Sequence, residues 1–124
     1  MWEKPVTDRD STARYNASDL NRVDANCAYL AQIFNVSIST RTWTRNDWPT
    51  PSEFARILSN INALKAAYPV AAQLPETPEN PINRYDKAND IERILQGLKS
   101  AYDEAKMALN YTGEIYSGDT IGVI

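Results

Sequence analysis

The sequence predicts an all-α domain: a three-helix bundle built from three related helical units, with a long proline-rich linker and a short extended or β C-terminal tail. Three observations support this prediction. One short segment occurs three times, apolar residues follow each occurrence at helical spacing, and capping residues precede the predicted helices. The chain has 124 residues, which suits one domain and is short for two.

The repeated segment begins with an acidic residue and has an arginine at its fourth position. It occupies 19–23, 53–57 and 90–94. From each occurrence, apolar residues continue in steps of three, four, three and four, which places them on one face of an α-helix. These stripe residues are Leu20, Val23, Cys27, Leu30 and Phe34; Phe54, Ile57, Ile61, Leu64 and Tyr68; and Ile91, Ile94, Leu98, Ala101 and Ala105. The pattern predicts helices at about 17–35, 51–68 and 87–109.

Capping residues agree with the predicted helix starts. Thr50 precedes Pro51, and Glu53 follows three residues after the threonine. This order is typical of an N-cap, a proline in the first turn and a capping box. Asn16 and Asp19 form a weaker version of the same pattern.

The segments outside the helices predict a linker and a tail. Prolines at four positions within 69–84 favour extended backbone and exclude a hidden helix. After a helical domain of residues 1–110, the segment 111–124 contains three of the four glycines, with a helix stop at Gly113, and predicts extended structure. A lone two-stranded ribbon is marginally stable in water. We therefore expect the tail to attach the domain to a partner, through Tyr111, Ile115, Tyr116, Ile121, Val123 and Ile124.

Composition argues against several function classes. The net charge of -3 and the pI of about 4.9 disfavour nucleic-acid binding. No apolar run is long enough to span a membrane, and the N-terminus lacks a secretory signal pattern, so we expect the chain in the cytoplasm of its producing cell. There is no histidine, and Cys27, the single cysteine, lies in a helical stripe. We therefore expect no enzyme, no catalytic residues, no metal site and no cofactor.

Polar residues at repeated positions allow two interpretations each. Arg22, Arg56 and Arg93 could form an anion-binding set, but each has an acidic residue three positions earlier, so local ion pairs are favoured. Asn26 and Asn60 occupy equivalent positions beside the stripe. They can bind either a partner or the backbone of a neighbouring loop, and the structural role is favoured.

Two tryptophans enclose a polar loop at 43–48. Trp43 and Trp48 could stack on a sugar, a base or a peptide, which gives the alternative function of a soluble glycan- or peptide-binding module. The indoles could instead fold back as lids on the bundle. The lid interpretation is favoured.

Several stretches resemble tail-associated minor structural proteins of phages and prophages of Gram-positive gut bacteria. The similarity involves residues 15–23 with Asn26 and the pair 29–30, the opening Trp2 with 5–9, parts of the second and third units, and the ending 111–118. It implies a non-enzymatic role in a tail or virion, near the baseplate or fibre attachment. The implied partners are other tail proteins or symmetry mates in a homo-oligomer, and the implied location is the cytoplasm and then the particle.

Overall fold

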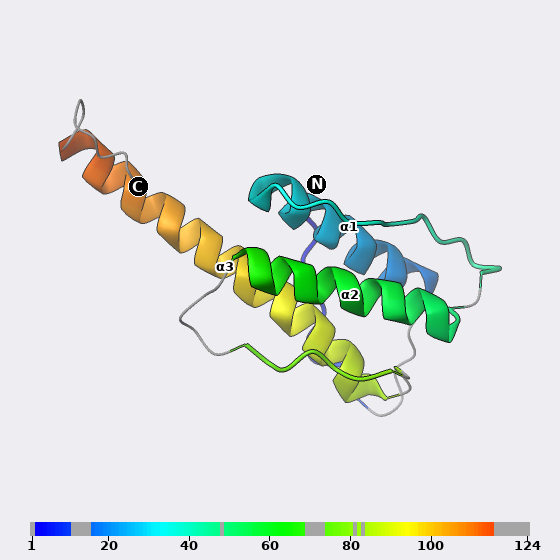
Figure 1. The fold of residues 1–124 in the computed structure, drawn as a ribbon. Coiled ribbons are helices and arrows are strands. Elements are labelled where there is room, and N and C mark those ends of the chain that lie inside the picture. The colour runs from blue at the N-terminus through cyan, green and yellow to red at the C-terminus, as the bar shows by residue number, and fades with distance from the viewer. Residues whose placement is uncertain are drawn as a thin grey trace.

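The chain forms three helices in the computed structural model, which describes residues 2–10, 16–47, 49–68, 74–80, 82 and 84–115, with backbone alone for 108–115. Helix α1 spans Ala17–Phe34, α2 spans Pro51–Ala67 and α3 spans Tyr85–Ile115. The described ranges contain no strand. The all-α, three-helix prediction is confirmed, and each repeated segment lies near the start of a helix (Figure 1).

Helix α1 begins and ends with defined caps. The Asn16 side chain accepts the Asp19 N–H at 3.0 Å, and the Asp19 side chain accepts the Asn16 N–H at 3.1 Å. This is a complete capping box, stronger than the sequence pattern indicated. The helix ends at Asn35, which adopts the left-handed conformation with φ 60°. Asparagine tolerates that conformation better than most residues, so it stops α1 cleanly.

Helix α2 uses the predicted N-cap. The Thr50 hydroxyl accepts the Glu53 N–H at 3.3 Å, and Pro51 occupies the first helical position, where a missing N–H costs no hydrogen bond. The Glu53 carboxylate binds Arg41 and Arg56. The α2 start is therefore tied to the loop before it as well as capped.

The core lies where the stripes of the three helices meet. Every stripe residue up to Leu30, Leu64 and Leu98 is buried. At the end of the bundle, Phe34 stacks on Tyr68 with ring centroids 4.6 Å apart, and Tyr102 meets both rings edge-on. Such aromatic pairs add to the free energy gained by burial. They close the bundle where α1 and α2 end.

The linker before α3 crosses that helix at Gly97. A Cβ atom there would lie 2.3 Å from Cδ2 of Leu74, closer than any real contact allows. Gly97 occupies the position that Asn26 and Asn60 hold in the other units. The glycine therefore makes room for the linker to pack against α3.

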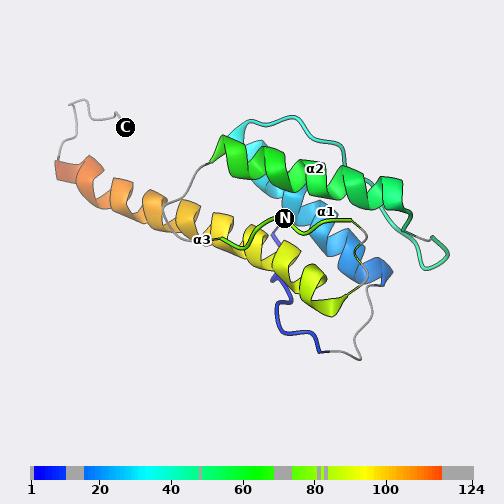
Figure 2. The ribbon, with the colours of Figure 1, turned by 60° about the horizontal axis from the view of Figure 1, so that its bottom comes forward.

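Helix α3 extends well past the end of the other two helices (Figures 1 and 2). Residues 103–107 are all exposed, including Ala105, so the prediction that Ala105 lies in the core is wrong. We name residues 103–115 the α3 arm. The exposure of residues 103–107 follows from the length of α3, because α1 and α2 stop before they can cover this part of it.

The prediction of an extended tail from residue 111 is wrong for its first part. Tyr111 to Ile115 are helical, and Gly113 does not stop the helix. A single glycine costs about 1 kcal/mol in a helix interior. A helix that is already nucleated adds residues readily, so it continues past that cost. The rest of the predicted tail, with Tyr116, Ile121, Val123 and Ile124, lies outside the described residues.

Candidate functional site

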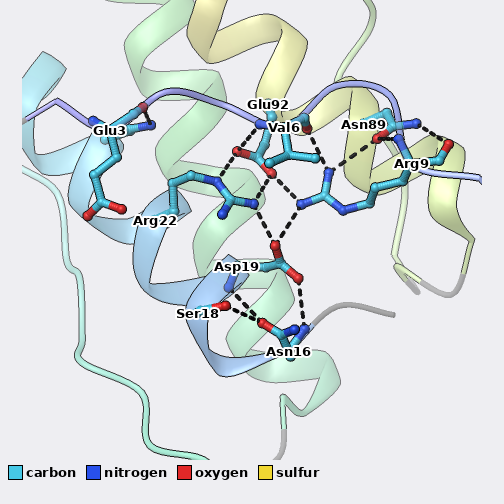
Figure 3. A network of polar contacts seen from close by, with 10 residues as sticks. Glu3, Val6, Arg9, Asn16, Ser18, Asp19, Arg22, Asn89 and Glu92 are labelled. Atoms are coloured by element: carbon cyan, nitrogen blue, oxygen red, sulfur yellow. Dashed lines mark hydrogen bonds and ion pairs between the residues drawn. The ribbon is translucent and has the colours of Figure 1, made fainter. Parts of the chain in front are cut away.

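The most extensive polar site joins the N-terminal segment to α1 and α3. Residues 2–10, here named the strap, have no helix or strand and run across both helices (Figures 2 and 3). Near its start, the Trp2 ring lies 5.7 Å from the Tyr29 ring, and the Lys99 ammonium lies over both rings. The Pro5 side chain is buried. The strap is thus packed on the bundle along its length.

Asparagine side chains hold the strap backbone at two points. Asn26 accepts the Glu3 N–H and donates to the Glu3 carbonyl, both at 2.8 Å. Asn89 accepts the Arg9 N–H at 3.0 Å and donates to the Arg9 carbonyl at 3.1 Å. Each amide satisfies both polar groups of one strap residue, as a neighbouring β-strand would. The structural role predicted for Asn26 is confirmed.

A buried carboxylate anchors the middle of the strap. The Glu92 side chain has no exposed surface. It accepts the Nε and Nη2 groups of Arg22, each at 2.7 Å, in a bidentate pair. It also accepts the Val6 N–H at 3.1 Å and a hydrogen bond from the Arg9 guanidinium. Four donors, two from α1 and two from the strap, therefore converge on one side chain of α3 (Figure 3).

Asp19 completes the network and balances its charge. It accepts from Arg22 at 2.6 Å and from Arg9 at 3.2 Å, so two arginines face two carboxylates. Burial raises the pKa of Asp19, but hydrogen bonds from the Asn16 backbone and Arg22, with the arginine charges, outweigh it and hold that pKa below its usual range. Hydrogen bonds to Glu92, opposed by burial, raise the pKa of Arg22. The lowered pKa of Asp19 and the raised pKa of Arg22 keep this pair charged at neutral pH.

A second network fixes the loop between α1 and α2. Asp24, which is buried, accepts two hydrogen bonds from Arg56, at 2.9 and 3.1 Å. Arg56 also donates to the Ser39 carbonyl at 2.7 Å, as does the Asn60 amide. The structural role predicted for Asn60 is confirmed, because its amide binds loop backbone.

Trp43 belongs to this second network. Its side chain is 3% exposed, and its indole N–H donates to Asp24 at 2.7 Å. Asn21 binds the Trp43 backbone in the same two-point manner as the strap asparagines, at 2.6 and 2.9 Å, and the Arg41 guanidinium lies 4.1 Å from the ring centroid. The lid interpretation is confirmed for Trp43. Its prediction as a partner-binding residue is wrong, because no face of the ring is free for a ligand.

The remaining predicted site residues are not gathered into one place. Trp48 lies outside the described residues. Tyr111 and Ile115 lie in the α3 arm, at the opposite end of the molecule from the loop that follows Trp43 (Figures 1 and 2). The loop and the C-terminal end therefore do not form a joint surface.

The three local arginine pairs were predicted correctly. Asp19–Arg22, Glu53–Arg56 and Asp90–Arg93 have N–O distances of 2.6, 3.0 and 3.2 Å. The partners of these arginines on other helices, Glu92 for Arg22 and Asp24 for Arg56, were not predicted. One signal was present: Ala88, Glu92 and Leu95 are spaced as a second stripe, which places the Glu92 carboxylate at the edge of the core.

Among the described residues, neither the thiol nor the carboxylates gather into a metal centre. Cys27 is fully buried, and burial raises the pKa of its thiol, so it packs as an apolar residue. Within the described ranges no three acidic or cysteine side chains are grouped to hold a metal ion. In the same ranges no helix combines the length and hydropathy that a bilayer span needs.

Comparisons with protein-family models, curated proteins and solved structures found no match to this chain. Two features distinguish the molecule: a bundle tied together by buried ion pairs and asparagine bridges, and a helix that leaves the bundle without a covering partner.

Proposed function

We propose that this chain is a non-enzymatic structural component of a phage or prophage tail or virion assembly, and that it docks through its C-terminal end. The observation that carries the proposal is the α3 arm. A helix gains most of its stability from packing an apolar face, and residues 103–107, the part of the arm whose side chains are described, are all exposed. An assembly that covers the arm would supply that missing contact.

The exposed side chains of the arm support a helix-docking mode. Met107 is 62% exposed, the most exposed large apolar side chain among the described residues. Methionine adapts its shape to a partner surface more easily than branched residues do. The sequence after it adds Leu109, Tyr111 and Ile115 in a stretch whose only charged residue is Glu114. Apolar anchors on one helix suit insertion into a groove of a neighbouring protein.

The remainder of the molecule suits a rigid base for such an arm. Three segments outside the helices are held on the bundle. Asn26 binds the strap, Asn21 binds the α1–α2 loop, and the linker packs on α3 at Gly97. These contacts fix α3 in the bundle at residues 89–102, directly before the arm begins. The arm therefore leaves the bundle in a defined direction, as a positional element of an assembly requires.

The test is incorporation into particles. The host that carries the gene is induced, particles are purified, and the chain is quantified by mass spectrometry for the wild type, Met107→Glu and Ser59→Glu. Ser59 is an exposed position on α2, so its variant adds the same charge on an exposed helix position away from the arm. Burying a methionine is worth roughly 1.5–3 kcal/mol. Met107→Glu should therefore lower incorporation at least about tenfold, and Ser59→Glu should not.

Both variants should keep the wild-type midpoint of urea unfolding, because both positions are exposed. A wild-type chain that is absent from purified particles contradicts the assembly role. Equal incorporation of Met107→Glu and wild type contradicts docking through the arm.

A further inference from the structure

We propose that the groove between α1 and α3 is an exchangeable binding site for the strap, so that residues 2–10 of a second copy of this chain can occupy it in place of the chain's own segment. The proposal does not depend on the role of the α3 arm. It assigns a ligand class to the groove: an extended peptide that presents a backbone N–H to Glu92 and, three residues later, an arginine side chain, as Val6 and Arg9 do.

The groove has the recognition elements of a peptide site. Asn26 and Asn89 each bind both backbone groups of one strap residue, which fixes an extended backbone. The Glu92 carboxylate accepts the Val6 N–H and the Arg9 guanidinium, and the Arg9 side chain is only 4% exposed. Backbone bonds give affinity in such sites, and a buried arginine pocket gives specificity.

The strap is bound to the bundle as a peptide ligand would be, although it is covalently part of the chain. Its contacts to Asn26, Asn89 and Glu92 come from other elements of the chain, and it forms no helix or strand of its own. A second copy's strap would make the same contacts, so exchange conserves them and is governed by concentration. Residues 11–15 join the strap to the α1 cap, and five extended residues reach about 17 Å. The two copies must therefore lie close together.

Two complementary variants test the exchange in the full-length chain. Arg9→Ala has a defective strap and an intact groove, whereas Glu92→Gln has an intact strap and a defective groove. Each variant alone weakens the junction: Arg9→Ala removes one donor to Glu92, and Glu92→Gln leaves Arg9 and Arg22 to share Asp19. In an exchanged heterodimer, the Glu92→Gln chain supplies an intact strap to the intact groove of the Arg9→Ala chain. In the other groove of that heterodimer, the Arg9→Ala strap meets the Glu92→Gln groove. Neither the arginine charge nor the glutamate charge is present there, and Asp19 still pairs with Arg22.

The two proteins are mixed, passed through partial unfolding in urea, dialysed and measured by native mass spectrometry. The ratio of heterodimers to homodimers should exceed its statistical value of about 1 by about tenfold, which corresponds to one recovered ion-pair contact of about 1.4 kcal/mol. The matched control pair is Arg84→Ala with Asp86→Asn, which removes an exposed ion pair outside the groove. That mixture should stay at the statistical proportion.

Two outcomes overturn the proposal: heterodimers of the groove variants at or below the statistical proportion, or the same excess in the control pair. Repeating the experiment with Met107→Glu in every chain separates strap exchange from association through the arm. A heterodimer excess that persists in that background supports exchange, and an excess that disappears assigns the association to the arm and overturns the exchange.

Discussion

Glu92→Gln should be among the most destabilising single changes that preserve side-chain volume in this protein. Glutamine keeps the shape of glutamate but offers one oxygen and one N–H2 group in place of two accepting oxygens. In the structure both oxygens accept, from Arg22, Arg9 and the Val6 N–H. The substituted amide would point donors at donors, whichever way it turned.

The magnitude follows from the burial of the site. The Glu92 side chain is 0% exposed, and those of Arg9 and Arg22 are 4% and 12% exposed, so water cannot replace the lost carboxylate. Breaking a buried ion pair costs about 3–5 kcal/mol. Asp19 still pairs with both arginines, which favours the lower end, about 3 kcal/mol. For a chain of this size the melting temperature should fall by about 10 °C.

The assay is equilibrium unfolding in urea at pH 7, followed by circular dichroism and tryptophan fluorescence. The matched control is Glu104→Gln, the same substitution at an exposed position of α3. It should change the free energy of unfolding by less than about 0.5 kcal/mol. A loss below about 1 kcal/mol for Glu92→Gln would refute the reasoning, because it would mean that desolvation of the carboxylate cancels what the arginines return.

Three further predictions concern other parts of the fold. Asn89→Ala should lower the free energy of unfolding by about 1–3 kcal/mol, because three hydrogen bonds to Arg9 are lost, and hydrogen exchange should show faster exchange at the Arg9 amide. Because the folded pKa of Asp19 lies below its ordinary value of 3.8, the stability that this group contributes is present above that value and is lost as pH falls through the folded pKa. Asp19→Asn should therefore flatten the acid limb of a stability-versus-pH curve, and an unchanged limb would contradict the assignment. Gly97→Ala should change the free energy of unfolding by less than about 1 kcal/mol, because the Leu74 Cδ2 atom that the new methyl group meets is the end of a flexible side chain and alanine favours a helix by about 1 kcal/mol over glycine; a loss above about 2 kcal/mol in urea unfolding would mean that Leu74 cannot move aside.

Helix positions and the core were predictable because they depend on local, periodic information. The spacing of Leu20, Val23 and Cys27 specifies one buried face whatever packs against it. The strap was not predictable in this way. Glu92 and Val6 are far apart in the sequence, and nothing local to either residue indicates that they meet.

The prediction of an extended segment from residue 111 failed for a different physical reason. Gly113 is a weak helix former, and the apolar residues around it suit a strand as well as a helix. Local preference was therefore nearly balanced, and a long helix already formed upstream decided the outcome. For Trp43, the sequence left burial and partner binding both open. Its burial depends on Asp24 and Asn21, whose positions only the folded α1 brings together.

Because α3 is one unbroken helix, it connects the two ends of this molecule mechanically. From Glu92 to Ile115 it rises about 35 Å. A load applied at the far end of such a rod is resisted where the rod is clamped, by the arginines that grip Glu92 from α1 and from the strap. Tension on the protruding end would therefore reach the ring contacts of Tyr102 first and the charged contacts of Glu92 after them, so both would have to yield before α3 leaves the bundle.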